Sequence, residues 1–290
     1  MPALQPIAAA HRGYNRKVEK LNGVKHLICV ASGKGGVGKS TTAVNLALAL
    51  HRRGAKVGLL DADIYGPSQP LMLGVPPGTR PRIIDKKFME PVAAHGIVSN
   101  SMGYLVEPTT AMAWRAPMIV GAFNQILKDT RWGELDYLIV DMPPGTGDIQ
   151  LTLAQQVPVT GAVIVTTPQD VALLDARKGM ELFRKVNVPL LGVVENMGTH
   201  ICSQCGHEEA IFGTGGGELL SRDYDTVLLG SLPLDLAIRE NTDRGTPIVV
   251  AIPDGPVARA YLALADSVME RIQALADGSS PGPAISITDD

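Results

Sequence analysis

Aromatic residues and cysteines are scarce in this sequence. Only 4% of its 290 residues are Phe, Trp or Tyr, and it contains three cysteines. Three thiols are too few for the disulfide framework of a small secreted domain, and in a reducing compartment a close cysteine pair more often binds a metal or acts in redox chemistry. Apolar residues nevertheless make up 45% of the chain, which is enough material for a hydrophobic core.

The sequence also lacks any concentration of charge and any long apolar run. Its formal net charge is −3, and Lys and Arg are scattered, so the electrostatic footprint of a nucleic-acid-binding protein is missing. No apolar run reaches the roughly 18 residues that a transmembrane helix requires. The N-terminal stretch MPALQPIAAAHRGYN has no basic leader, which argues against a signal peptide. We therefore expect a cytoplasmic protein with neither nucleic acid nor membrane as a partner.

No Pro/Ser-rich linker interrupts the middle of the chain. We therefore expect one domain over residues 24–276, between a flexible N-terminal tail at 1–23 and a disordered C-terminal tail at 277–290. Between Pro67 and Val98 the sequence becomes rich in Pro and Gly, which predicts an irregular excursion or a small hairpin.

Short apolar runs alternate with helical stretches along this domain. Strands are predicted at 26–32, 56–61, 137–141, 161–167, 191–197 and 226–232, and helices at 40–53, 118–128, 171–185 and 257–276. Continuous runs of Val, Ile and Leu are typical of parallel strands buried on both faces, so the fold class is α/β, a single doubly wound, mostly parallel sheet flanked by helices. The carboxyl ends of such strands share one edge, where ligands bind. The strand-end positions are Ser32, Asp61, Asp141, Thr167, Asn196 and Pro233.

The segment GKGGVGKS at 33–40 lies between a predicted strand and a predicted helix, the context that a phosphate-binding P-loop requires. Glycines let successive backbone N–H groups converge on phosphate oxygens at a helix N-terminus. Lys39 is expected to reach the β- and γ-phosphates of ATP, and the Ser40 hydroxyl to bind Mg²⁺. The predicted nucleotide-binding residues are Gly33, Lys34, Gly35, Gly36, Val37, Gly38, Lys39, Ser40 and Thr41.

Two further loops, which we predict to be the first and second switch loops, follow strands at the same edge. DADIYGPSQP at 61–70 carries Asp61 and Asp63, and YLIVDMPPGTGD at 137–148 carries Asp141 in the position of a Walker B aspartate. Carboxylates there can bind a water on Mg²⁺ or orient the attacking water. Strand-end aspartates are also common as helix caps and turn formers, so the P-loop before them supports the functional interpretation.

Cys202 and Cys205 form a CxxC motif directly after a predicted strand. Two thiolates are half of the four ligands that zinc or a [4Fe–4S] cluster usually takes, and Cys29 lies in a buried strand, where we expect an ordinary core cysteine. A two-fold axis near this loop would bring two CxxC pairs together. A zinc site within one chain that adds His200 and His207, a thiol redox role, and plain surface histidines remain alternatives.

Taken together, GKGGVGKST, DADIYGPSQP, DMPPGTGD, CxxCG and SLPLD resemble in type and order the Mrp/ApbC-type iron–sulfur cluster carriers. These belong to the deviant Walker A family, which also includes MinD, ParA and the nitrogenase iron protein. The resemblance implies a homodimer in which Lys34 reaches into the opposite nucleotide site, slow ATP hydrolysis, and a bridging [4Fe–4S] cluster passed from a donor to apo-proteins.

The resemblance also implies roles for single residues. It gives Asp63 the positioning of the attacking water, Asp61 a place on the Mg²⁺ side, Asn196 a contact to adenine and Pro233 a place near the base. An alternative is a positioning ATPase like MinD or ParA with structural zinc at the cysteines. A MinD-like protein is expected to end in a basic amphipathic helix and a ParA-like protein to carry a basic DNA-facing patch, and the sequence displays neither.

Overall fold

A computed structural model describes residues 21–105, 116–202 and 205–278. The two predicted tails lie outside these ranges for residues 1–20 and 279–290. No helix within the described ranges is both long enough and apolar enough to cross a membrane.

All six predicted strands are present and lie in one sheet. They run in parallel in the spatial order β11, β9, β8, β1, β7, β2. Their bounds are Val24–Ala31 for β1, Val57–Asp61 for β2, Leu135–Asp141 for β7, Gly161–Thr166 for β8, Leu190–Ile201 for β9 and Leu228–Leu234 for β11. Because these strands are parallel, their carboxyl ends meet at one edge, and the predicted α/β fold class is confirmed.

The prediction for residues 67–98 was right about a small hairpin but wrong in leaving out strands that extend the main sheet. The segment does contain a short helix, α2 (Gln69–Met72), and a small hairpin of β3 (Ile83–Ile84) and β4 (Phe88–Met89). It also leads into β6 (Ile97–Ser101), a further parallel strand beside β2, with β5 (Val92–Ala94) antiparallel at the outer edge.

The β6 strand escapes a search for apolar runs because three of its five residues are polar and buried. Each of the three has a hydrogen-bond partner that offsets the cost of burial. Ser99 bonds the carbonyl of Val92, Asn100 bonds Thr130 at 2.8 Å, and Ser101 bonds Asp61 at 3.0 Å.

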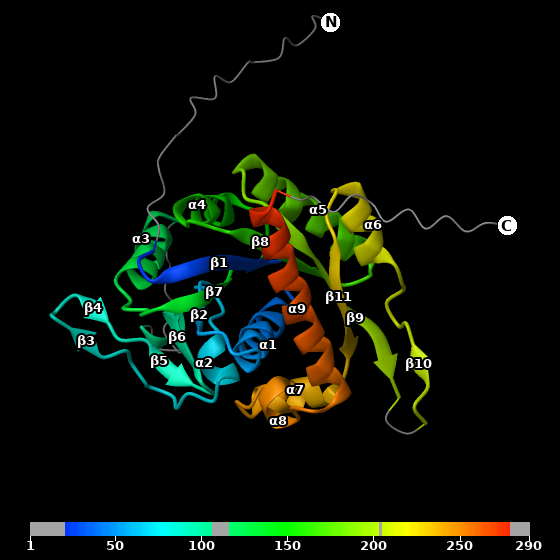
Figure 1. Ribbon diagram of the computed structural model, residues 1–290, viewed down its shortest axis with the longest axis horizontal. Helices are drawn as coiled ribbons and strands as arrows, with labels where there is room; N and C mark the ends of the chain where they lie inside the picture. Colours follow the sequence, from blue (N-terminus) through cyan, green and yellow to red (C-terminus); the bar gives the residue numbers. More distant parts are fainter. Residues whose placement is uncertain (1–20, 106–115, 203–204, 279–290) are drawn as a thin grey trace, which may run out of the picture.

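Helices cover both faces of the sheet. On one face lie α1 (Lys39–Arg52), α7 (Leu236–Asp243), α8 (Ile248–Ala251) and α9 (Pro256–Ala276), and on the other α3 (Ala116–Lys128), α4 (Asp148–Gln156), α5 (Asp170–Lys185) and α6 (Gly216–Asp223). Alternate residues of β1 enter the two cores, Ile28 on the first face and Cys29 on the second. Figure 1 shows α9, the last helix, crossing the sheet beside α1.

The longest strand, β9, continues beyond the body of the sheet. Its last residues pair antiparallel with β10 (Glu208–Glu209), and the resulting hairpin projects at the lower right of Figure 1. The pairing of β9 with β11 shifts register after Asn196, where Met197 has a φ of 58°, rare for a side chain of its kind. The hairpin therefore leaves the sheet through an irregular stretch of β9.

Candidate functional site

The phosphate loop connects β1 to α1 and has the backbone shape that anion binding needs. Gly36 and Gly38 have φ angles of 83° and 82°, in the left-handed region that glycine adopts without strain. Helix α1 begins at Lys39, and Gly38 supplies no side-chain cap to its first turn. The N–H groups of that turn therefore remain suited to bind phosphate oxygens, aided by the helix dipole.

Close neighbours hold the ends of this loop. A Cβ atom placed on Gly33 would lie 2.0 Å from the carbonyl oxygen of Asp175 on α5, and one on Gly38 would lie 2.1 Å from Nδ2 of Asn196. The same Nδ2 donates a 2.8 Å hydrogen bond to the carbonyl of Val37. Both glycines are thus required by packing, and α5 and β9 fix where the loop lies.

Lys39 and Asp141, predicted from separate motifs, meet in a buried ion pair. The Lys39 ammonium bonds Oδ1 of Asp141 and lies 3.1 Å from Oγ of Ser40. The other carboxylate oxygen, Oδ2 of Asp141, accepts a 2.9 Å hydrogen bond from Nε2 of Gln69. Lys39 is 6% exposed and Asp141 is fully buried. The P-loop and the Walker B strand are therefore joined directly through charge.

Asp61 acts as the anchor of the loop that follows it. Its buried carboxylate accepts hydrogen bonds from the backbone N–H groups of Asp63, Ser68 and Gln69, at 3.0–3.1 Å, and from the hydroxyl of Ser101. Burial, with the nearby Asp141 charge adding to it, raises the pKa of Asp61 to about 7. This carboxylate shapes the first switch loop, and its predicted place on the Mg²⁺ side stays a prediction.

Asp63 lies on the same loop and is less enclosed by donors. Its carboxylate accepts a 3.2 Å hydrogen bond from the N–H of Gly66. Burial raises its pKa, while the positive charge of Lys39 opposes that shift. The structure thus places it near Lys39, and its water-positioning role stays a prediction.

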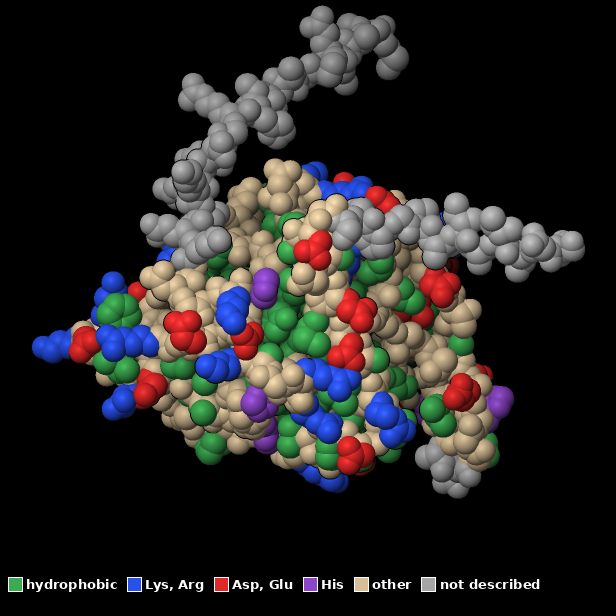
Figure 2. Space-filling view, viewed as in Figure 1, with side chains coloured by type: hydrophobic (Ala, Val, Ile, Leu, Met, Phe, Trp, Pro, Cys, Tyr) green, Lys and Arg blue, Asp and Glu red, His purple; other side chains and the backbone are tan. Residues whose placement is uncertain are grey.

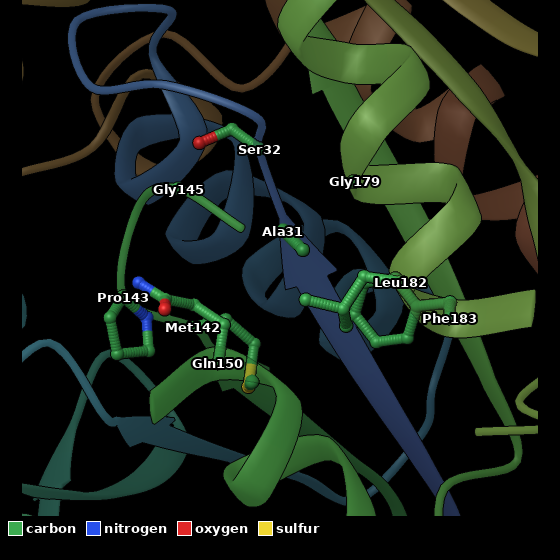
Figure 3. Close-up of a pocket in the computed structure, with 9 residues that line it drawn as sticks. All are labelled: Ala31, Ser32, Met142, Pro143, Gly145, Gln150, Gly179, Leu182 and Phe183. Carbon is green, nitrogen blue, oxygen red and sulfur yellow. The ribbon is translucent and has the colours of Figure 1, made fainter. Parts of the chain in front are cut away.

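The loop after β7 is the second predicted switch. The N–H of Gly145 donates a 3.0 Å hydrogen bond to the carbonyl of Ser32, and Nε2 of Gln150 donates a 2.6 Å bond to the carbonyl of Pro144. Figure 3 shows the small cavity behind this loop, where Met142 faces Leu182 and Phe183 of α5. The loop is therefore held by one hydrogen bond to Ser32, beside the P-loop, and by one to Gln150 of α4, with the small cavity behind it.

Lys34 differs from Lys39 in its surroundings. Its backbone carbonyl accepts a 2.8 Å hydrogen bond from the Ser32 hydroxyl, which fixes the turn. Within the described residues, no acidic side chain forms an ion pair with the Lys34 ammonium, and the side chain is only half-buried. None of the described acidic side chains therefore neutralises its charge.

Asn196 and Pro233, predicted to lie near the base, occupy neighbouring strands. Residue Leu232 of β11 pairs with Asn196 of β9, so Pro233 follows directly beside it. The structure brings these two residues together at the edge that holds the P-loop. The amide of Asn196 bonds the P-loop carbonyl, and its contact to adenine stays a prediction.

This corner of the sheet has the donor set of a magnesium–nucleotide site. The uncapped first turn of α1 offers N–H groups for phosphates, and the Ser40 hydroxyl and nearby carboxylates offer the hard oxygen ligands that Mg²⁺ prefers. Sequence reasoning missed Gln69, which is 1% exposed and bonds both Asp141 and Ser40. Its only signal was its place within the DADIYGPSQP motif.

The cysteine pair lies in the turn of the β9–β10 hairpin. Cys202 follows β9 directly, its N–H donates a 2.9 Å hydrogen bond to the carbonyl of His207, and its carbonyl accepts a 2.8 Å bond from Gly206. Cys205 is exposed and Cys202 is half-buried. Figure 2 shows the hairpin as a protrusion from the body of the molecule.

Cys29 does not belong to this pair. It is fully buried in the core, and burial raises the pKa of its thiol to about 12. The Nδ1 atom of His200 lies 3.1 Å from the carbonyl oxygen of Leu234. Across the described part of the chain, no group of three or more His, Cys, Asp or Glu side chains is placed to hold a metal ion. One chain therefore presents two thiols at the hairpin.

Comparison with known proteins gives a consistent result over most of the chain. Residues 23–269 match the ParA family, in the form described as NUBPL iron-transfer P-loop NTPase. The iron–sulfur cluster carrier protein of Pseudomonas fragi is 60% identical over 259 residues, which cover 89% of this chain and 90% of that protein. The protein of the same name from Escherichia coli K12 is 60% identical over 252 residues, covering 87% of this chain and 68% of its relative.

The fold has a close counterpart among solved structures. A nucleotide-binding protein from Archaeoglobus fulgidus, solved in complex with ADP, superimposes with a TM-score of 0.69 at 37% identity. The match covers 78% of this chain and 88% of that protein. The similarity to a nucleotide-binding protein therefore extends to the fold over most of the chain.

Proposed function

Because the chain belongs to the ParA family of P-loop NTPases, in the form described as NUBPL iron-transfer NTPase, we propose that it is an ATP-dependent iron–sulfur cluster carrier. In this proposal it binds and slowly hydrolyses ATP with Mg²⁺, binds a [4Fe–4S] cluster between two subunits in the cytoplasm, and passes that cluster from a donor to apo-proteins. The names of its relatives support the carrier role. The geometry of the phosphate loop supports the nucleotide part of the proposal, and the geometry of the cysteine hairpin supports the cluster part.

The nucleotide part of the proposal rests on the phosphate loop. The N–H groups at the start of α1 and the Lys39 ammonium would hold the phosphates, and Ser40 would hold Mg²⁺, which when bound offsets negative charge on them. Lys39 would then exchange its bond to Asp141 for bonds to phosphate oxygens. Asp63 would orient the attacking water, Asp61 would take a place on the Mg²⁺ side, and Asp141 would serve as the Walker B aspartate.

A second chain completes the site through Lys34. Its ammonium has no acidic partner within the described part of its own chain, so it is available to offset the charge that develops on the transferred phosphoryl group of the opposite subunit. Hydrolysis would then require the dimer, which makes ATP a means of controlling how two subunits meet.

The observation that carries the carrier role is the placement of the cysteines. Two thiols, Cys202 and Cys205, lie in a hairpin that projects from the sheet, while Cys29 is enclosed in the core. Two thiolates are half of the usual ligand set of a [4Fe–4S] cluster, and a two-fold dimer supplies four. A cluster held at an exposed edge by two hairpins is accessible to an acceptor protein.

Anaerobic reconstitution tests this part. We expect about two iron and two sulfide per chain, a dimeric mass, and transfer to an apo-protein whose activity needs a [4Fe–4S] cluster. Cys202→Ser and Cys205→Ser are expected to abolish cluster binding while ATP binding is kept, and Cys29→Ala serves as the matched control that keeps both. A monomer loaded with zinc, or full transfer by the two hairpin variants, would contradict the carrier role.

Mixing two inactive variants tests whether Lys34 acts on the opposite subunit. Lys34→Ala and Asp63→Ala are each expected to lack ATPase activity. Random mixing makes half of the dimers heterodimers, and each heterodimer has one intact site of two, so about a quarter of the activity should return. If Lys34 acted within its own chain, the mixture would stay as inactive as the two variants measured separately.

A further inference from the structure

Gln69 lies where three motifs of the nucleotide site meet. Its side-chain Nε2 donates hydrogen bonds to the carbonyl of Ser40 at 3.0 Å and to Oδ2 of Asp141 at 2.9 Å. Its backbone N–H donates a 3.0 Å bond to Oδ2 of Asp61. One residue that is 1% exposed therefore contacts the P-loop, the Walker B strand and the base of the first switch loop.

The chemistry of its partners fixes how the Gln69 amide is oriented. The Ser40 carbonyl and the Asp141 carboxylate are both acceptors, so only the NH₂ end of the amide can face them. Both hydrogens of that NH₂ group are thus used within the nucleotide site. Oε1 is left on the other side of the amide, buried and without a hydrogen-bond partner among the described residues.

The Asp141 carboxylate is held by the Gln69 amide as well as by its ion pair with Lys39. Its two oxygens are divided between two donors, Oδ1 bonding Lys39 and Oδ2 bonding Gln69. If Lys39 turns toward the phosphates of a bound nucleotide, Gln69 remains as the donor that holds the buried carboxylate. A buried carboxylate without donors is costly, so this bond gains importance in the nucleotide-bound state.

The first switch loop has incomplete hydrogen bonding at this point. Within the part of the chain that the structure describes, the Oε1 atom of Gln69 and the hydroxyl of the preceding Ser68 are both buried without a hydrogen-bond partner. Buried polar atoms without partners are rare in native proteins, and each costs free energy in the conformation that leaves it unsatisfied. A loop that exchanges its hydrogen-bond partners when a ligand binds has such unsatisfied polar atoms in one of its two conformations.

We propose that Gln69 is a positioning residue for nucleotide hydrolysis, which holds Asp141 through Nε2 and couples the first switch loop to the phosphate loop. This inference rests on the proposed function, because it presupposes that ATP and Mg²⁺ bind at Lys39 and Ser40. It assigns Gln69 a place beside the reacting groups, with its effect transmitted through Asp141 and through the loop that begins at Asp61.

Hydrogen exchange measured by mass spectrometry, with and without Mg-ATP, tests the coupling. In the unaltered chain we expect ATP to protect both residues 33–41 and residues 61–73. Gln69→Met keeps the length of the side chain but removes the donor, so protection should persist at 33–41 and be lost at 61–73. The matched control is Gln273→Met on α9, which removes an exposed amide that bonds Asp277, the residue that follows this helix.

Steady-state kinetics supply a second readout. For Gln69→Met we expect kcat to fall about tenfold while KM for ATP stays within about twofold, because the lost interaction acts on the reacting groups and not on ATP binding. Gln69→Glu places carboxylate oxygens against two acceptors, so its kcat should fall at least as far. It also serves as the second variant if Gln69→Met is unstable.

The inference would be overturned if either folded variant kept the kcat of the unaltered chain and full protection at 61–73. It would also be overturned if protection were lost at both segments together, since that indicates a general loss of structure. Absence of protection at 33–41 in the unaltered chain would instead overturn nucleotide binding itself, and the coupling with it. The exchange pattern thus separates failure of the coupling from failure of the proposed function.

Discussion

The nucleotide edge and the cysteine hairpin are built in opposite ways. At the nucleotide edge, Lys39, Asp61 and Asp141 are buried, and each has at least two hydrogen-bond partners. In the hairpin, residues 205–209 are exposed, and backbone bonds to Cys202 hold the turn. The first region holds its charged side chains in a buried hydrogen-bond network, while the second lies at the surface, with Cys205 exposed and Cys202 half-buried.

One strand connects these two regions. Residue Asn196 of β9 braces the P-loop, and the strand ends at Ile201, directly before the cysteine pair. Between them lie Met197, with its positive φ, and Gly198, whose Cβ position would fall 2.3 Å from the Ser231 hydroxyl. The contrast between a buried and an exposed region therefore occurs within a few residues of one element.

The largest effect that separates the two regions is expected from Lys39→Ala. It leaves Asp141 buried without its cation, and breaking a buried pair in this way costs about 3–5 kcal/mol of unfolding free energy. Loss of the phosphate contact should also remove measurable ATP binding in calorimetry. The control is Lys25→Ala, which breaks an exposed ion pair to Asp136 and should change stability little. Equal denaturation midpoints for Lys39→Ala and Lys25→Ala would show that the buried ion pair matters no more for stability than the exposed one.

A smaller effect is expected from Gly38→Ala. The left-handed backbone at this position costs a residue with a Cβ about 1–2 kcal/mol, and the Cβ would also displace the amide of Asn196. Gly133 has a φ of 72° and open space around its Cβ position, so Gly133→Ala isolates the backbone cost. We expect Gly38→Ala to lose more stability in urea titrations and to bind ATP more weakly. Identical losses in the two variants would show that the packing against Asn196 contributes nothing.

The smallest effect on stability is expected in the hairpin. Cys202→Ser and Cys205→Ser should each change the free energy of unfolding by less than about 0.5 kcal/mol, because these side chains lie outside the core. Alkylation at pH 8 should modify these two thiols in the native protein and Cys29 only after unfolding, since burial raises the Cys29 pKa to about 12 and keeps the thiol protonated. Three thiols that react at the same rate would mean that the core is open at β1.

Much of the fold was predictable because apolar runs identify strands that are buried on both faces. The six strands found in this way all lie in the sheet, and their carboxyl ends do share the edge where the motifs meet. The β6 strand was not predictable by the same signal. Asn100 and Ser101 bond Thr130 and Asp61, which lie 30 and 40 positions away, and Ser99 bonds Val92 on the neighbouring strand β5. Such partners are not visible in the pattern of apolar residues.

The candidate site was predictable at the level of motifs and less so at the level of contacts. The sequence motifs named Lys39, Asp61 and Asp141, and the structure brings them into one network. That Asp61 accepts four hydrogen bonds, and that Asp141 is shared between Lys39 and Gln69, depends on how β2, β7 and α1 pack.

By itself, the sequence determined the α/β class, the P-loop and the pairing of two cysteines in a CxxC motif, because these depend on local spacing and on the periodicity of apolar residues. Only the tertiary structure decided that Gln69 faces Asp141, that Asn196 braces Val37, and that β9 carries the cysteines out of the sheet. Those contacts join segments from different strands, and their distances are set by the packing of the whole sheet.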